Sequence, residues 1–132
     1  MTNTATASIA PSQDIAAHLA DLLRLIAAGK GNEAFAKYYA EDVVMGENEQ
    51  PPTIGYQANF EREQQFYATI GRFEEFSVLA HGTGRDHSFY ESIARWVDTA
   101  GKSHRTRQVA IARWRNGRIV DERFVYDSPA VI

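Results

Sequence analysis

The last third of the chain constrains the fold most strongly. Between Arg72 and Asp127, four segments of strand-like composition follow one another, at about residues 73–83, 87–98, 103–115 and 118–126. Asn116-Gly117 separates the last two segments, and an Asn-Gly pair between two strands is the strongest short hairpin signal. This region therefore predicts an antiparallel sheet.

The chain before residue 72 has mostly helical periodicity. A first helix is expected to open at Pro11-Ser12, with Ser12 as N-cap and Asp14 in the first turn, and to end at Gly29 and Gly31. Its apolar face is formed by Ile15, Leu19, Leu22, Leu23 and Ile26. Asn32 is expected to cap a short second helix. Helices first and an antiparallel sheet last is an α+β pattern.

The middle of the chain predicts one short strand and a third helix. Residues 43–45 are typical of a strand, and the prolines and glycines of residues 46–55 indicate a loop. A helix is expected at about residues 58–70, with Phe60, Phe66, Tyr67 and Ile70 as its packing residues. A strongly bent sheet wrapped against such helices would form a cone with a pocket inside.

Composition narrows the class of protein. The 132 residues suffice for one hydrophobic core, and the absence of cysteine excludes disulfides and thiol chemistry. The net charge of −3 argues against nucleic acid or an anionic membrane as the main partner. No apolar run approaches the length of a transmembrane helix. The expected location is the cytoplasm.

The domain organisation is expected to be simple. Residues 1–10 are small and polar, lack the basic start and apolar core of a signal peptide, and are expected to form a disordered tail. Residues 11–132 are expected to form a single domain, because no linker or internal repeat divides them. No metal-binding spacing such as His-Glu-x-x-His occurs, so we expect neither a metal nor a cofactor.

The order of these elements resembles a known superfamily. A helix pair leads to the phrase Tyr38-Tyr39-Ala40-Glu41-Asp42-Val43-Val44-Met45, then to a proline-glycine loop, a third helix and the hairpin around Asn116-Gly117. Over about residues 12–127 the chain resembles the nuclear-transport-factor-2-like (NTF2-like) superfamily, and within it SnoaL-like polyketide cyclases and ketosteroid-isomerase-like proteins. The resemblance implies an α+β cone, with three N-terminal helices packed on a strongly curved, mainly antiparallel sheet. It does not fix the activity, because the superfamily includes isomerases, cyclases, dehydratases, epoxide hydrolases and non-catalytic proteins.

Glu47 is the first candidate catalytic residue. Ketosteroid isomerases carry a general-base aspartate just past the short strand, and the resemblance places that role on Glu47. A carboxylate can take a proton next to a carbonyl group if desolvation raises its pKa. The alternative is a solvated loop carboxylate. The isomerases also need a tyrosine on the first helix, which here has His18 instead, and a protonated aspartate, whose position falls near Ala110. Both departures argue against true ketosteroid isomerase activity.

The resemblance also implies which face of the sheet lines the pocket, because successive side chains of a strand alternate between faces. The residues placed inside are His104, Thr106, Gln108, Ala110, Ala112 and Trp114 on one strand, and Val120, Glu122, Phe124 and Tyr126 on the next. Two alanines on a concave face leave room for a ligand. The opposite parity would bury Val109 and Ile111. We prefer to place both on the convex face with Val125, where a second copy of the chain would cover them.

The aromatic residues favour a flat, apolar ligand such as a polyketide, a steroid or a terpene-like molecule. The expected ligand-binding residues are Tyr56, Phe60, Gln108, Ala110, Ala112, Trp114, Phe124 and Tyr126. Of these, Tyr56 and Tyr126 could donate a hydrogen bond to a carbonyl oxygen.

Glu122 and His104 complete the candidate catalytic set. An acid beside Trp114 and Phe124 should have a raised pKa or be paired with an arginine. Glu122 is therefore either an acid or base opposite Glu47, or an edge carboxylate paired with an arginine. The pairing is the favoured interpretation, with Arg105, Arg107, Arg113 or Arg123 as the partner. SnoaL-like cyclases use a strand histidine, a role that His104 could fill, although its position beside a turn favours a surface histidine.

Three functions remain open on this basis. The first is a SnoaL-like enzyme of the isomerase or cyclase type, which would use Glu47 as base, with a tyrosine or Glu122 as its partner, on an apolar carbonyl compound. The second is a non-catalytic ligand-binding or structural dimer. The third is a water-activating hydrolase, which would need an arginine between two carboxylates. A carboxylate that is buried in the cavity without a cationic partner would favour the first function over the second.

Overall fold

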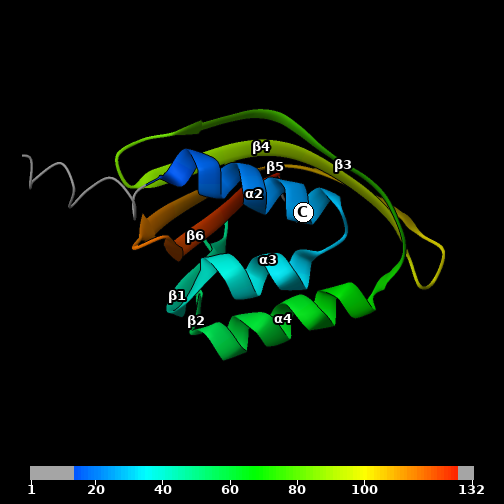
Figure 1. Ribbon diagram of the computed structural model, residues 1–132. Helices are drawn as coiled ribbons and strands as arrows, with labels where there is room; N and C mark the ends of the chain where they lie inside the picture. Colours follow the sequence, from blue (N-terminus) through cyan, green and yellow to red (C-terminus); the bar gives the residue numbers. More distant parts are fainter. Residues whose placement is uncertain (1–13, 128–132) are drawn as a thin grey trace, which may run out of the picture.

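The computed structural model describes residues 14–127, in which three helices pack on one six-stranded sheet. The elements are α2 (Ile15–Ala27), α3 (Gly31–Tyr38), β1 (Tyr39–Glu47), β2 (Thr53–Ile54), α4 (Tyr56–Ala68), β3 (Ile70–Thr83), β4 (His87–Asp98), β5 (Ser103–Arg115) and β6 (Arg118–Tyr126). The predicted α+β cone is confirmed, while the expected tail at residues 1–10 lies outside the described residues. Figure 1 shows the chain running from the helices into the long strands.

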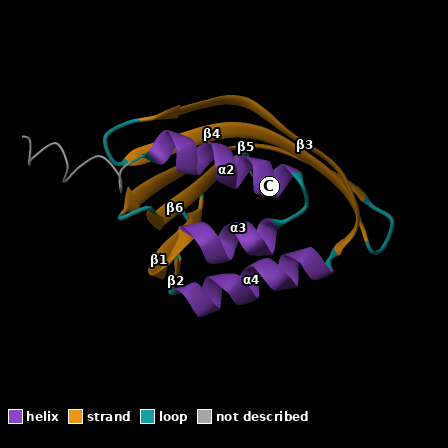
Figure 2. Cartoon of the chain, in the orientation of Figure 1, coloured by secondary structure: helices purple, strands orange, loops and turns teal. Residues whose placement is uncertain are grey.

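The sheet has the strand order β2-β1-β6-β5-β4-β3. β1 and β6 are parallel, and every other neighbouring pair is antiparallel. The register of β3 against β4 shifts at three places, and such irregularities bend and twist a sheet. Figure 2 shows the result, in which the strands curve around the helices and leave their outer face without a helical layer.

The apolar face predicted for the first helix packs against the concave face of the sheet. Ile15, Leu19 and Leu22 are each no more than 3% exposed. The helix begins one residue after Asp14, whose side chain accepts a hydrogen bond from the backbone N–H of Ala17. Asp14 is thus itself the N-cap, whereas Ser12, the predicted cap, lies outside the described residues. The Asn116-Gly117 turn joins β5 to β6 as predicted, with both residues at positive φ.

The helix cap and the element ends predicted for the middle of the chain differ from the structure by several residues. Asn32 does not cap α3, because the helix already starts at Gly31 and the Asn32 amide bonds Gln64 instead. The strand predicted at residues 43–45 runs from Tyr39 to Glu47. Its pairing with β6 extends it beyond what its own sequence indicates. Ile70, predicted as the end of the third helix, begins β3.

A buried asparagine fixes α4 against the sheet. Asn59 is 1% exposed, and its amide nitrogen donates hydrogen bonds to three backbone carbonyl oxygens. The acceptors are Val43 at 3.4 Å, Thr53 at 3.0 Å and Gly55 at 2.8 Å. Because these residues belong to β1, to β2 and to the start of α4, Asn59 sets how the helix lies across the open end of the cone.

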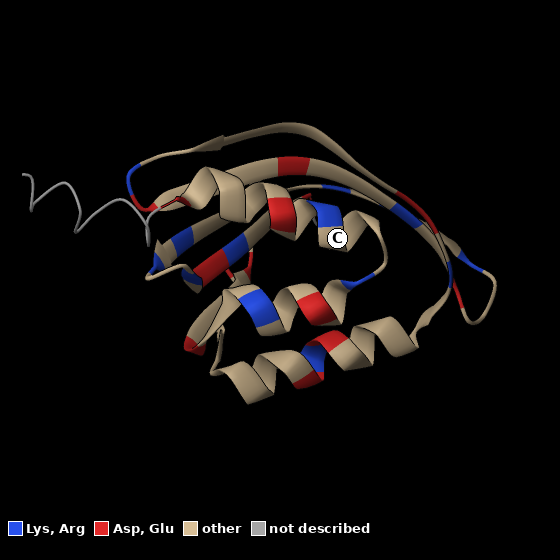
Figure 3. Cartoon of the chain, in the orientation of Figure 1, with Lys and Arg blue, Asp and Glu red and all other residues tan. Residues whose placement is uncertain are grey.

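Charged residues of both signs are interspersed over the helices and strands (Figure 3). Among the residues that the structure describes, no helix is long and apolar enough to cross a lipid bilayer.

Candidate functional site

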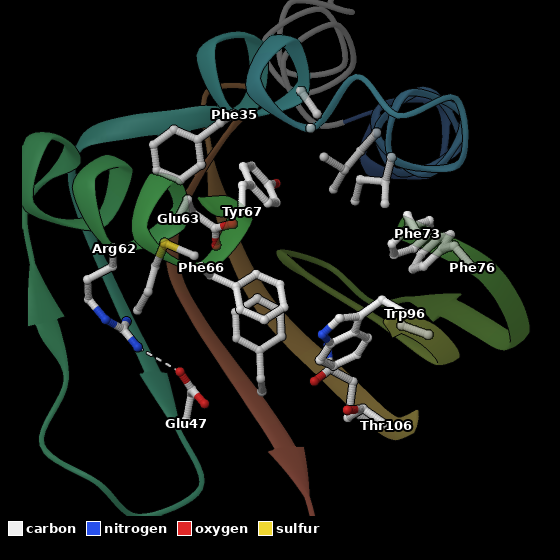
Figure 4. Close-up of a pocket in the computed structure, with 18 of the residues that line it drawn as sticks. Phe35, Glu47, Arg62, Glu63, Phe66, Tyr67, Phe73, Phe76, Trp96 and Thr106 are labelled. Carbon is white, nitrogen blue, oxygen red and sulfur yellow. Dashed lines mark hydrogen bonds and ion pairs between the residues drawn. The ribbon is translucent and has the colours of Figure 1, made fainter. Parts of the chain in front are cut away.

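A cavity of about 710 Å³ lies between the concave face of the sheet and the three helices. Its apolar wall includes Leu22, Ile26, Phe35, Met45, Phe66, Phe73, Phe76, Trp96 and Phe124. Its polar groups are Tyr39, Glu47, Arg62, Glu63, Gln65, Tyr67, Tyr90, Thr106, Gln108 and Tyr126. Figure 4 shows aromatic rings from α4 and the strands surrounding the space, with carboxylates along one side. A space of this size and lining suits a small, largely apolar molecule.

Glu47 lies at the end of β1 and faces this cavity, but it has two partners. The Arg62 guanidinium approaches the Glu47 carboxylate to 2.6 Å, and the Tyr126 hydroxyl donates a hydrogen bond to the second carboxylate oxygen. The side chain of Glu47 remains 37% exposed. The hydrogen bond to Glu47 is the main cause that raises the pKa of Tyr126, to about 12. Both carboxylate oxygens of Glu47 are thus engaged, one by a guanidinium and one by a hydroxyl group.

Glu122 is buried in the body of the cone. It is 1% exposed, and one of its carboxyl oxygens shares a hydrogen bond with the Tyr39 hydroxyl. The other oxygen, Oε2, has no hydrogen-bond partner among the described residues. Burial raises the pKa of Glu122 to about 8, and the charge of Glu63 acts in the same direction, while the Tyr39 hydrogen bond opposes both. Glu122 is therefore mostly protonated at neutral pH.

The arginine partner predicted for Glu122 is absent from the described residues. Arg105, Arg107 and Arg113 point to the opposite face of β5, since they alternate with the residues on the Glu122 side, and Arg123 does the same on β6. Arg107 bonds Glu91 instead, at 2.8 Å. The favoured interpretation of Glu122 as an ion-paired edge carboxylate is thus wrong, and the buried acid is what the structure shows.

Two cavity-lining tyrosines were missed by the sequence reasoning. Tyr39 and Tyr90 are 6% and 5% exposed, and burial is the main cause that raises the pKa of each well above its ordinary value. The charge of Glu122 is the next cause for both. Tyr39 starts β1, and the parallel pairing of β1 with β6 brings it to Glu122, 83 residues away. No local sequence pattern predicts a contact between residues so far apart in the chain.

Glu63 is a second acid that the sequence reasoning missed. It lies on α4 and lines the cavity, and burial raises its pKa while a hydrogen bond with Tyr67 lowers it. A signal was present in the sequence, because Glu63 falls three residues after Phe60 and four before Tyr67, within the apolar face predicted for that helix. A charged residue in the apolar face of a helix is a candidate site residue, because charged side chains are seldom buried without a reason.

The predicted ligand-binding residues divide into two groups. Gln108, Phe124 and Tyr126 line the cavity. Ala110, Ala112 and Trp114 share the concave face, as the predicted parity requires, but they are buried in the core beyond the cavity. Tyr56 and Phe60 also lie outside the cavity lining and stack against each other beside the core.

Packing explains why the strand alanines leave no room for a ligand. Trp114 lies next to them on β5, and its indole N–H donates to the Ser88 hydroxyl at 2.8 Å. The rings of His18 on α2 and Tyr38 on α3 both lie 5.9 Å from Trp114. The helices therefore fill the space above the alanines, and the cavity begins toward the other end of the strands.

His104 lies outside the cavity lining, although it shares the concave parity. Its Nε2 is 2.8 Å from the Asp98 carboxylate, and its ring stacks on Trp96 at 5.1 Å. The hydrogen bond to His104 is the main cause that lowers the pKa of Asp98. His104 thus tethers the β4–β5 turn, and a direct catalytic role has no geometric support. Within residues 14–127, no group of three or more histidine or acidic side chains is arranged to hold a metal ion.

Comparison with known proteins relates the chain to solved structures. Its sequence matches no family model and no curated protein. The structure resembles a candidate SnoaL-like polyketide cyclase from Mesorhizobium loti, with a TM-score of 0.74, 23% identity and coverage of 83% of this chain and 97% of that one. It also resembles a candidate polyketide cyclase from Xanthomonas campestris, with a TM-score of 0.70, 19% identity and coverage of 89% and 93%.

A third similar structure is a candidate isomerase from Rhodopseudomonas palustris, with a TM-score of 0.67, 15% identity and coverage of 81% of this chain and 84% of that one. At such identities the likeness concerns the fold. The element order and the curved sheet agree with this likeness, and the chain has the NTF2-like fold.

Proposed function

We propose that the protein is a small-molecule enzyme of the isomerase or cyclase type, which carries out acid–base chemistry on an apolar carbonyl compound inside the cone. The observation that carries this proposal is Glu122, a fully buried carboxyl group without a cationic partner. A buried acid without a cationic partner costs folding free energy. Glu122 lies outside the cavity lining but is bonded to Tyr39, which lines it, and this position favours a functional role over a structural one.

The Glu122–Tyr39 pair suits the binding of a carbonyl oxygen. In the structure the Tyr39 hydroxyl donates to Glu122. Because Glu122 is mostly protonated at neutral pH, its O–H can instead donate to the Tyr39 oxygen. The Tyr39 O–H can then turn toward a ligand, since Tyr39 lines the cavity. Such a donor, on a tyrosine that is itself only 6% exposed, stabilises negative charge that develops on a carbonyl oxygen.

The cavity wall indicates the substrate class. Phe66, Phe73 and Trp96 offer flat apolar surfaces, while Tyr39 and Gln108 offer hydrogen bonds. A flat, mainly apolar ketone with few polar groups matches this lining. The cyclases and isomerases among the structural neighbours support the same class.

The hydrolase alternative has less support. It needs an arginine between two carboxylates, and Arg62 is the cavity arginine. Arg62 bonds Glu47 (Figure 4). The hydroxyl group that lowers the pKa of Glu63 is that of Tyr67. The described residues therefore contain no arginine that bridges two cavity carboxylates.

Proton exchange tests the proposed function against the non-catalytic alternative. Flat cyclic ketones would be incubated with the protein in D2O, and exchange of the protons next to the carbonyl would be followed by NMR. We expect exchange above the buffer rate, and a decrease of about tenfold or more in Tyr39→Phe. Binding of the ketones without any exchange would identify a non-catalytic ligand-binding protein.

The predicted homodimer is retained as a proposal. Phe89 is 47% exposed and Val125 is 40% exposed on the convex face. Phe89 pairs with Ile111, and Val109 pairs with Val125, so these side chains form one apolar patch. No described helix covers this face (Figure 2). A second copy would shield the patch from water, and its burial would add to stability.

A further inference from the structure

Glu63 is held at the cavity wall by the same helix face that anchors α4. Asn59 lies one turn earlier and is fixed to the carbonyls of Val43 and Thr53. Residues four apart share one face of a helix, so the anchor turns Glu63 inward. Tyr67 lies one further turn along, and its hydroxyl packs against Gly31, where a Cβ would collide with it. The Gly31 backbone thus allows Tyr67 to pack closely and to support the Glu63 carboxylate.

The two cavity-lining carboxylates differ in their partners. Glu47 is bonded to a guanidinium at 2.6 Å and to a hydroxyl. Glu63 has one hydroxyl partner, Tyr67, and the Arg62 side chain is directed to Glu47 (Figure 4). A carboxylate becomes a stronger base when fewer partners stabilise its anion and when it is desolvated. Glu63 has no guanidinium partner of this kind, and burial raises its pKa, so we take it as the better candidate for the proton acceptor.

Glu63 is also coupled to the donor side of the cavity. Its charge contributes to the raised pKa values of Tyr39, Tyr90 and Glu122. These groups come from β1, β4 and β6, whereas Glu63 comes from α4. The acceptor and the donors therefore stand on different elements that enclose one space. A ligand bound there would be in contact with both sides.

We propose that Glu63 is the proton acceptor of this site and that Tyr39 is the hydrogen-bond donor to the substrate oxygen, an inference that rests on the proposed function. The C–H bond next to the carbonyl breaks, and its proton moves to a carboxylate oxygen of Glu63. The electron pair of that bond forms the C=C bond of an enolate, whose oxygen is stabilised by the Tyr39 O–H. Return of the proton to a different carbon gives an isomer, and return to the same carbon gives exchange with solvent.

The test uses 2-tetralone, a flat bicyclic ketone, and measures exchange of its C1 protons in D2O. Four variants of the full chain are compared with the wild type, namely Glu63→Gln, Glu63→Asp, Glu47→Gln and Glu61→Gln. Glu61 is the matched control, because it is an exposed glutamate on the same helix that bonds Gln57 outside the cavity. Affinity for 2-tetralone is measured for each variant from tryptophan fluorescence, and folding from the urea midpoint.

We expect Glu63→Gln to lower the exchange rate by about 100-fold or more, with a change in Kd below about threefold. Glu63→Asp should lie between this variant and the wild type, because it keeps the charge but withdraws it by one methylene. Glu61→Gln should stay within about fivefold of the wild type, and Glu47→Gln should lose much less of the exchange rate than Glu63→Gln. The wild-type rate should rise with pH as Glu63 ionises, and this rise should vanish in Glu63→Gln. Glu47, Arg62, Tyr67 and Glu122 are present in both proteins, and loss of the Glu63 charge in the variant lowers the pKa of Glu122.

The outcomes separate the two proposals. If the wild type exchanges and Tyr39→Phe is slow, but Glu63→Gln keeps the wild-type rate, then Glu63 is not the acceptor and the proposed function stands. A large loss of the exchange rate in Glu47→Gln alone would identify Glu47 as the proton acceptor instead of Glu63. If the wild type binds 2-tetralone without exchanging it, both proposals are overturned.

Discussion

Replacing Glu122 with glutamine should flatten the pH dependence of folding stability. In the folded protein, burial raises the pKa of Glu122 from 4.5 to about 8. The unfolded chain exposes the side chain, so its pKa returns to the ordinary value. Between these two values the folded state holds a proton that the unfolded state has released. The contribution of Glu122 to the free energy of unfolding is therefore fully present below pH 4.5, decreases as the pH rises, and levels off above about pH 8.

The size of the effect follows from the two pKa values. Each unit of difference corresponds to about 1.4 kcal/mol, so the wild type should lose about 3 to 4 kcal/mol between pH 5 and pH 8. Glu122→Gln keeps the shape of the side chain but cannot ionise, and it should lack this loss. With an m-value of about 2 kcal/mol/M in urea, the wild-type midpoint should fall by about 2 M relative to that of the variant.

Urea unfolding of both proteins at pH 5, 6, 7 and 8, followed by tryptophan fluorescence, measures this difference. Other titrating groups are common to both proteins, so they cancel in the comparison. Asp121→Asn is the control, because Asp121 is an exposed acid next to Glu122 on the other face of β6. Equal pH dependence in wild type and Glu122→Gln would show that Glu122 is ionised in the folded protein. Glu122 and Tyr39 would then not form a neutral hydrogen-bonded pair, and the proposed donor would be refuted.

Three further predictions concern the anchor, the ion pair and the convex face. Asn59→Ala removes the side-chain hydrogen bonds to three backbone carbonyl oxygens, and it should lower the free energy of unfolding by about 2 kcal/mol and the Tm by about 8 °C. A thermal scan by circular dichroism that shows a decrease below about 2 °C would contradict this. Glu47→Gln should change the free energy of unfolding by less than about 1 kcal/mol, since the pair with Arg62 is largely exposed, and a larger loss in urea unfolding would count against that assignment. Phe89→Arg should convert a dimer to a monomer in sedimentation velocity, and a mass unchanged from the wild type would rule out this face as the interface.

The elements of the fold were largely readable from the sequence. The helical spacing of Ile15, Leu19 and Leu22 identified the buried face of the first helix, and Asn116-Gly117 identified the final hairpin. Both signals are local, because a helix repeats every 3.6 residues and a tight hairpin turn needs residues that tolerate positive φ. The cap at Asn32 and the ends of the third helix were wrong by a few residues, because α3 and α4 both begin without a side-chain cap and so lack the local signal for a helix start.

The candidate site was only partly readable. The alternation of side chains placed Gln108, Glu122 and Phe124 on the concave face of the sheet, and the structure has them there. The same alternation predicted that Ala112 lines the pocket, whereas in the structure Ala112 is buried in the core beneath the helices. Alternation tells which face a residue occupies, but the neighbouring layer decides whether that face is a cavity or a core.

The partners of the acids were decided by tertiary structure alone. Tyr39 meets Glu122 because β1 and β6 pair in parallel, and a parallel pair needs a long connection, so the contact spans 83 residues without a local signal. The position of α4 over the sheet brings Arg62 into an ion pair with Glu47, whereas Glu63 interacts with the Tyr67 hydroxyl. The sequence determined which elements form and which acids the chain carries. Desolvation and the nearest charge set the pKa of each acid, and both depend on the packing of distant segments.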